Sequence, residues 1–326
     1  MATQTTPSAE ITASRKTSTR KRGYVDGYNP QAKTVVLLNQ IIGVLNEFRD
    51  HWPLTARQIF YRLVGAHGAD KSEQFYGKLC HHLAMARRGR LIPFDAIRDD
   101  GVTTYPMDRF ADADAFRAYV KAKAANYRRD LMATQDIHIE VWCEAGGMLP
   151  QLVRIAKEYS IKCFSSGGFD SLTAKKDLAD RICKIGKPCV VLHLGDFDPS
   201  GESIFNSVAN DVSAFVRADR LHAMVEVEFR RIALTCDQVE ELDLPTAPAK
   251  SSDSRAKAWI GGTCQLEALA PDQIAEILRT EILAVIDHDT MQDSLEIEQY
   301  EREQLTQRLL MGPASDNNPK QHNEHD

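Results

Sequence analysis

Two aspartates stand two residues apart directly after a run of apolar residues. The run covers residues 190–194, and Asp196 and Asp198 follow it, with Pro199 expected to turn the chain before a helix that begins near Glu202. Alternation along an extended chain points both aspartates to the same side. Two such charges repel each other unless a cation lies between them, and carboxylate oxygens suit Mg²⁺. By itself, such a pair is more often a solvated turn or a helix cap.

The elements around these aspartates alternate between strand and helix from residue 136 onward. Apolar runs predict strands at 137–143, 161–165, 188–194 and 225–234, separated by helices at 148–159, 171–185 and up to 216. Such alternation favours a largely parallel sheet, whose ligands gather at the carboxyl ends of the strands. Glu144 and Asp196 both stand at that end of their strands. We therefore expect an α/β fold that brings these acids together.

The front part of the chain has the apolar spacing of helices. Helices are predicted at 31–49, 56–64 and 71–88, followed by a short strand or wing at 91–98. Thr55 can cap the second helix, and Gly89 ends the third. Three helices and a wing are typical of a winged-helix module, which brings a helix and basic side chains to a DNA duplex. A small helical domain that binds nothing is the alternative.

Charge is segregated along the 326 residues, although the net charge is −6. Residues 1–34 hold six basic and two acidic residues, and residues 51–98 hold eight and three, whereas residues 265–326 hold four and fourteen. A basic front half can place phosphates on one face of the protein. Arg87, Arg88 and Arg90 are the candidates for contacts with the DNA backbone, and a solvated helix end is an equally good interpretation of them.

Composition excludes several other classes of protein. The chain is 43% hydrophobic and 26% charged, with no apolar stretch near 18 residues and no charged-then-apolar leader, so we expect neither a membrane span nor a secretory signal. The seven cysteines are scattered and never in Cys-x-x-Cys spacing, which indicates reduced thiols rather than zinc ligands. A cytoplasmic, nucleoid-associated protein is expected.

Three motifs in order resemble one known family. Glu144 followed by the segment 196–201 (DFDPSG) resembles the Toprim domain of topoisomerases and primases. The segment 54–62 (LTARQIFYR) resembles the Arg-x-x-(Tyr/Phe)-Tyr motif of the DNA topoisomerase VI A subunit and its meiotic double-strand-break relatives. The segment 264–269 (CQLEAL) resembles the segment that follows Toprim in that family. In length the chain is most similar to the short stand-alone homologues called Mini-A.

The resemblance implies a winged-helix domain that carries a DNA-cleaving tyrosine, followed by a Toprim domain. Tyr61 would be that nucleophile, forming a 5′-phosphotyrosyl link, with Glu144, Asp196 and Asp198 binding Mg²⁺. Because a phenol with a pKa near 10 is a poor nucleophile at neutral pH, it needs help. Arg57 lies four residues earlier, on the same helix face, and could stabilise a phenolate or hold the phosphate. Glu144 could also accept a proton.

The same resemblance implies partners. The tyrosine and the metal would come from different subunits, so a homodimer acting on double-stranded DNA is expected, with one site for each strand. The chain has no ATPase segment, so strand passage would require a separate ATPase subunit. It also departs from the family at Ala145, where lysine is frequent.

Other interpretations of these residues stay open. Tyr61 could be a core aromatic, Arg57 a surface ion-pair partner and Glu144 a helix cap. Two further functions follow from such alternatives. One is a Toprim nuclease that hydrolyses DNA with water, and the other is a catalytically silent DNA-binding subunit of a mobile-element or defence assembly.

The expected domain organisation follows these motifs. It comprises a flexible basic arm at 1–30, a winged-helix domain at 31–108, a connecting helix within 109–135, a Toprim domain with a C-terminal helical extension at 136–311, and a disordered tail at 312–326. The extension, predicted as one helical stretch over 271–311, is acidic and is a candidate dimer or docking element.

Overall fold

A computed structural model describes residues 24–98, 109–165, 172–222, 224–249 and 259–311. Most of the predicted basic arm and the whole predicted tail lie outside the described residues. None of the helices in the described ranges has the length and apolar character needed to cross a membrane.

Three helices form the first part of the chain, as predicted: α1 (Ala32–Glu47), α2 (Ala56–His67) and α3 (Glu73–Arg88). The predicted wing is shorter than expected. It contains a single turn of 3₁₀ helix and the two-residue strand β2 (Ile97–Arg98), which pairs in parallel with β1 (Leu54–Thr55). This small sheet joins the segment before α2 to the segment after α3.

Helix α2 is defined at both ends by the local sequence. Thr55 Oγ1 accepts a hydrogen bond from the Gln58 amide at 3.1 Å, and Gln58 Oε1 accepts one from the Thr55 amide at 2.9 Å. This reciprocal capping box satisfies two amides that would otherwise lack partners. Gly68 ends the helix with a φ of 62°, a conformation that favours glycine. The helix therefore holds Tyr61 in a fixed position.

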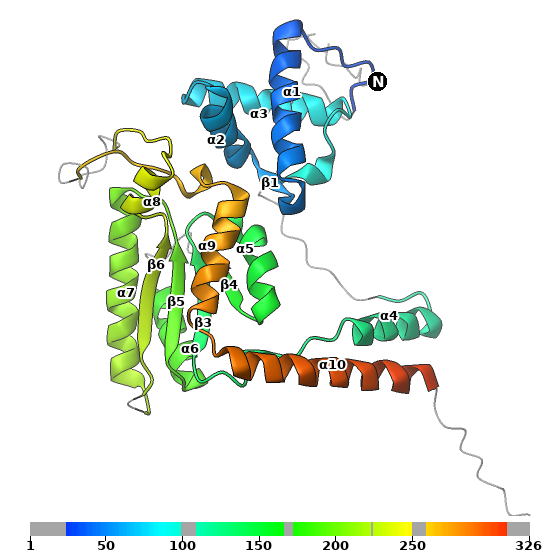
Figure 1. The fold of residues 1–326 in the computed structure, drawn as a ribbon, viewed down its shortest axis with the longest axis vertical. Helices are drawn as coiled ribbons and strands as arrows, with labels where there is room; N and C mark the ends of the chain where they lie inside the picture. Colours follow the sequence, from blue (N-terminus) through cyan, green and yellow to red (C-terminus); the bar gives the residue numbers. More distant parts are fainter. Residues whose placement is uncertain (1–23, 99–108, 166–171, 223, 250–258, 312–326) are drawn as a thin grey trace, which may run out of the picture.

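A four-stranded sheet with every strand parallel forms the rest of the core, which confirms a mixed α/β fold with parallel pairing (Figure 1). Its strands, in spatial order, are β4 (Lys162–Ser165), β3 (His138–Cys143), β5 (Cys189–Leu194) and β6 (Val227–Ala233). One face packs against α6 (Leu172–Ile185) and α7 (Pro199–Asp219), and the other against α5 (Leu149–Ala156) and α9 (Pro271–Leu283). The central strands β3 and β5 therefore end between two helical layers.

Three predicted helices differ from the structure. Helix α7 begins at Pro199 rather than near Glu202, because Pro is well suited to the first helical turn and Asp198 caps the helix. The predicted helical stretch 271–311 is broken into α9 and α10 (His288–Met311). The predicted connecting helix is shorter, at α4 (Ala113–Ala125), and lies along α10 (Figure 1).

Candidate functional site

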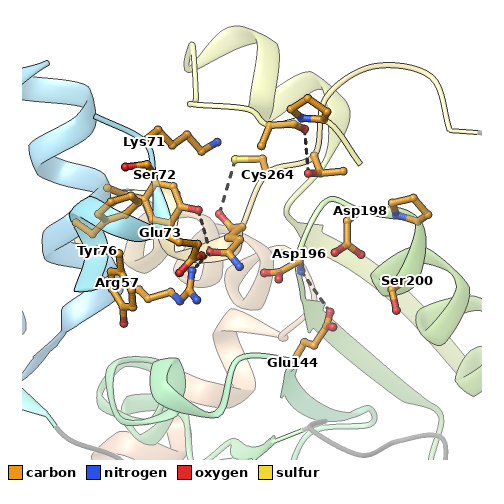
Figure 2. A pocket seen from close by; sticks show the side chains of 17 residues that line it. Arg57, Lys71, Ser72, Glu73, Tyr76, Glu144, Asp196, Asp198, Ser200 and Cys264 are labelled. Carbon is orange, nitrogen blue, oxygen red and sulfur yellow. Dashed lines mark hydrogen bonds between the residues drawn. The ribbon is translucent and has the colours of Figure 1, made fainter. Parts of the chain in front are cut away.

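A cavity of about 610 Å³ lies where the helical part meets the carboxyl end of the sheet. The segment after α8 (Cys236–Glu241) closes another side of this cavity. Figure 2 shows the side chains that line it. The residues used below are Arg57, Tyr61, Lys71, Tyr76, Glu144, Asp196, Asp198, Cys264 and Gln265. Tyr61, Arg57 and the three acids predicted as ligands thus share one cavity within a single chain.

Each of the three carboxylates is oriented by a backbone amide. Glu144 Oε2 accepts a hydrogen bond from the Asp196 amide at 3.3 Å, and Asp196 Oδ1 accepts one from the Leu266 amide at 2.9 Å. Asp198 Oδ1 accepts the Gly201 amide at 2.7 Å, which is the N-terminal cap of α7. One oxygen of each carboxylate is therefore held by the backbone.

Gly201 leaves open a space bordered by the Asp196 carbonyl oxygen and by one carboxylate oxygen each of Glu144 and Asp198. A Cβ atom at this position would lie 2.6 Å from the Asp196 carbonyl oxygen, 3.1 Å from Glu144 Oε2 and 3.4 Å from Asp198 Oδ1. The first distance is shorter than real Cβ contacts allow. Glycine is required at position 201 because the Asp196 backbone approaches it closely. Its conformation is not the reason, because any residue can adopt this helical conformation.

Burial and like charge both act on the acids. Burial, followed by repulsion from Asp196, raises the pKa of Glu144 to about 6. Burial also raises the pKa of Asp196, and the Asp198 charge adds to the effect. The second acid of the Asp-x-Asp pair thus makes ionisation of the first more costly. Such a cluster would be stabilised by a bound cation.

A half-buried arginine on β6 lies behind the acids. Arg231 donates from Nη2 to the Asp196 carbonyl oxygen and from Nε to the Leu234 carbonyl oxygen at 3.1 Å. Its charge lowers the pKa of both Glu144 and Asp196, although less than burial raises them. Arg231 therefore fixes the backbone of the Asp196 loop and offsets part of the negative charge.

On the opposite wall, Tyr61 and Arg57 share one acceptor. Tyr61 Oη donates to Gln265 Oε1 at 2.8 Å, and Arg57 Nη1 donates to the same oxygen at 2.7 Å. The Tyr61 side chain is only 4% exposed, and burial raises its pKa above its ordinary value, while the Arg57 charge acts in the opposite sense. Arg57 also lies over the Tyr76 ring, 4.8 Å from its centroid.

The carboxylates fit Mg²⁺ in chemistry, although they are not preassembled around it. The three ligands predicted for Mg²⁺ are all hard oxygen donors, and metal-binding carboxylates are commonly oriented by hydrogen bonds of this kind. In the described part of the chain, no group of three or more His, Cys, Asp or Glu side chains is arranged tightly enough to enclose a metal ion. Glu144, Asp196 and Asp198 are nevertheless the residues that would hold it.

The predicted DNA-contacting arginines lie away from this cavity. The cavity is lined by residues at the start of α3, namely Ser72, Glu73 and Tyr76. Arg87 and Arg88 lie at the other end of this helix, about 20 Å further along it. Arg87 packs on the Phe94 ring at 4.7 Å, and Arg90 packs on the Tyr24 ring at 4.4 Å. These contacts stabilise the turn after α3.

Three residues that sequence reasoning did not single out belong to the site. Gln265 joins the two walls, Glu267 raises the pKa of Tyr61, and the Lys71 Nζ atom lies 5.7 Å from the Tyr61 ring centroid. Gln265 and Glu267 fall within the segment 264–269 that supported the resemblance, so their position in that motif was the available signal. Lys71 had no such signal, because a lone lysine before a helix is ordinary.

No protein-family model matches this chain, and no curated protein matches it either. The geometry of the cavity therefore carries the functional inference.

Proposed function

We propose that this protein cleaves double-stranded DNA by Mg²⁺-dependent transesterification, with Tyr61 as the nucleophile. The helical part would act as a winged-helix domain and the sheet part as a Toprim domain, as in the topoisomerase VI A subunit. One observation carries the proposal: a single cavity joins a tyrosine and an arginine on α2 to three carboxylates at the carboxyl ends of β3 and β5.

The proposed reaction conserves the energy of the phosphodiester. The Tyr61 Oη atom forms a bond to phosphorus as the bond from phosphorus to the 3′ oxygen breaks, which leaves a 5′-phosphotyrosyl link and a 3′-hydroxyl. Arg57 donates to a non-bridging phosphate oxygen. Mg²⁺ at Glu144, Asp196 and Asp198 would neutralise charge that develops on the phosphate and the leaving oxygen. Because the link retains the phosphodiester energy, the strand can be resealed.

Two chains are needed to cut both strands, since each chain carries one Tyr61. The resemblance implies that the tyrosine of one subunit acts with the metal of the other. In this structure, Tyr61 and the acids line the same cavity of one chain, so we propose a homodimer in which each subunit holds a complete site. Strand passage would still require a separate ATPase subunit.

Covalent trapping tests the proposal directly. Purified protein is incubated with end-labelled duplex DNA and Mg²⁺ and then denatured, and the label that remains on the protein is measured. We expect Tyr61→Phe to abolish trapping, because phenylalanine has no nucleophilic oxygen. Tyr76→Phe is the matched control, since Tyr76 is another tyrosine that lines the cavity, and it should trap as wild type does. Equal trapping by Tyr61→Phe and wild type would rule out Tyr61 as the nucleophile.

Hydrolysis by water is the second candidate, and the burial of Tyr61 favours it. A phenol that is 4% exposed and has a raised pKa ionises with difficulty. In this case, metal-dependent nicking would survive in Tyr61→Phe and disappear in Asp196→Ala. Salt-sensitive DNA binding without any cleavage would instead indicate a silent DNA-binding subunit.

A further inference from the structure

The orientation of the Gln265 amide is determined by Arg57. A guanidinium group can only donate hydrogen bonds, so the side-chain atom 2.7 Å from Arg57 Nη1 must be the amide oxygen. The same oxygen lies 2.8 Å from Tyr61 Oη, and an amide oxygen can only accept. The Tyr61 hydroxyl must therefore donate its proton toward Gln265, which sets the direction of the phenol O–H bond.

This arrangement is compatible with a neutral phenol and not with an ionised one. If Tyr61 lost its proton, the phenolate oxygen would face the lone pairs of another oxygen at hydrogen-bond distance. The groups around the phenol include both basic and acidic side chains: Arg57 and Lys71 are basic, and Glu267 and Asp196 are acidic. A donor hydrogen bond to the phenolate would be needed as the proton leaves.

The backbone around Gln265 is anchored to the carboxylate loop. Cys264 forms an antiparallel bridge with Phe197, through hydrogen bonds of 2.8 and 2.9 Å. The next amide, that of Leu266, donates to Asp196 Oδ1 at 2.9 Å. The Gln265 backbone is therefore fixed relative to Asp196, and only its side chain is free to change partners.

We propose that Gln265 is a positioning residue that acts as an amide latch, accepting from Tyr61 and Arg57 in the resting state and donating to the Tyr61 oxygen during cleavage. A phosphate that enters the cavity takes the hydrogen bond of Arg57. The freed amide then turns about its terminal bond and presents Nε2–H to Tyr61 Oη. The phenol proton passes to solvent, and the departing 3′ oxygen takes a proton from solvent to become the 3′-hydroxyl. The latch rests on the proposed function and adds the step that couples substrate binding to activation of the nucleophile.

Two substitutions test whether Gln265 must donate a hydrogen bond to Tyr61 as well as accept one. Gln265→Leu removes both the acceptor and the donor at similar volume. Gln265→Glu keeps the acceptor for Tyr61 and Arg57 but removes the donor. We expect each variant to lower the single-turnover rate of covalent-complex formation by about 100-fold with unchanged DNA affinity. In Gln265→Glu, the rise of the rate with pH should also move to higher pH, because a negative charge beside the phenol opposes its ionisation.

The resting contacts are checked by NMR of protein labelled at tyrosine ¹³Cζ, with the Tyr61 signal assigned by its absence in Tyr61→Phe. That signal should shift in Gln265→Leu, which loses the hydrogen bond. A Gln265→Glu variant that cleaves as fast as wild type, or an unshifted Tyr61 signal in Gln265→Leu, would overturn the latch alone. A wild-type protein that forms no covalent complex at all would overturn the proposed function as well, so the two failures are distinguishable.

Discussion

Two acids, one within strand β3 and one just after it, have pKa values shifted in opposite directions. Glu140 lies in the strand and is fully buried, with hydrogen bonds from Arg181 Nε at 2.7 Å, Arg181 Nη2 at 2.9 Å and Trp142 Nε1 at 3.0 Å. Burial alone would raise its pKa, but these bonds and one to His138 lower it to about 2. Glu144, just past the end of the strand, has a pKa raised to about 6 by burial and by Asp196.

The difference separates an acid whose charge is balanced within the fold from acids whose charges are only partly balanced. The Glu140 charge is balanced inside the protein, so its pairing stabilises the native state. At Glu144, Asp196 and Asp198 the charges repel one another, with partial relief from Arg231 and, at Asp196, also from Arg57. Groups with strongly perturbed pKa values in a cavity are typical of functional sites. Replacing acids in the two regions should therefore have opposite consequences.

The largest effect is expected at the acids that lack a balancing charge. Asp196→Asn should lower covalent-complex formation by about 1,000-fold, because the amide cannot supply the negative charge that binds Mg²⁺. Its thermal stability should be equal to or above that of wild type. Glu202→Gln is the matched control, since Glu202 lies in the first turn of α7 outside the ligand set, and it should cleave normally. Full activity in Asp196→Asn would remove Asp196 from the site.

A smaller effect, on stability alone, is expected at the balanced acid. Glu140→Gln should lower the free energy of unfolding by about 3 kcal/mol, because Arg181 loses its charged partner in a buried network. Since the pKa of Glu140 is lowered by folding, its contribution is present above its unfolded value, near 4.5, and is lost as the pH falls toward 2. Urea unfolding at several pH values should show the difference from wild type shrinking over that range.

Local sequence predicted the elements that carry the acids, because strands between helices have a clear periodicity. The ends of β3 and β5 fall within one residue of prediction, and parallel strands necessarily bring Glu144 and Asp196 to one edge. Thr55 predicted the start of α2 for the same local reason. These parts of the site depend on residues close together in the chain.

The remaining parts depend on contacts between distant segments. Gln265 meets Arg57 across 208 residues, and neither hydrophobic periodicity nor turn chemistry reports such a contact. The start of α7 was misplaced because Pro199 was expected to turn the chain before the helix, whereas it lies in the first turn of the helix that Asp198 caps. That Tyr61 and the three acids line one cavity of a single chain was likewise not predicted, since the family resemblance implied that they come from different subunits.

The smallest expected effect is the change in the free energy of unfolding caused by Glu144→Gln. It distinguishes the two regions most sharply because its sign is opposite to that expected for Glu140→Gln. Folding raises the pKa of Glu144 from about 4.5 to about 6, so the folded protein binds this proton more tightly than the unfolded chain. The native state is therefore destabilised as the pH rises through this window, and the cost is fully present above about pH 6. Glu144→Gln removes that cost and should raise the free energy of unfolding by on the order of 1–2 kcal/mol at pH 7.5.

Thermal unfolding of Glu144→Gln and wild type, measured in EDTA from pH 4 to 8, tests this sign. The gain should vanish below about pH 4.5, where Glu144 is protonated in both states, and it should shrink when Mg²⁺ is added, because only wild type gains stability by binding the cation. A loss of stability at pH 7.5 comparable to that of Glu140→Gln would mean that Glu144 is a structural acid too. In that case the contrast along β3 would no longer support the position of the metal site.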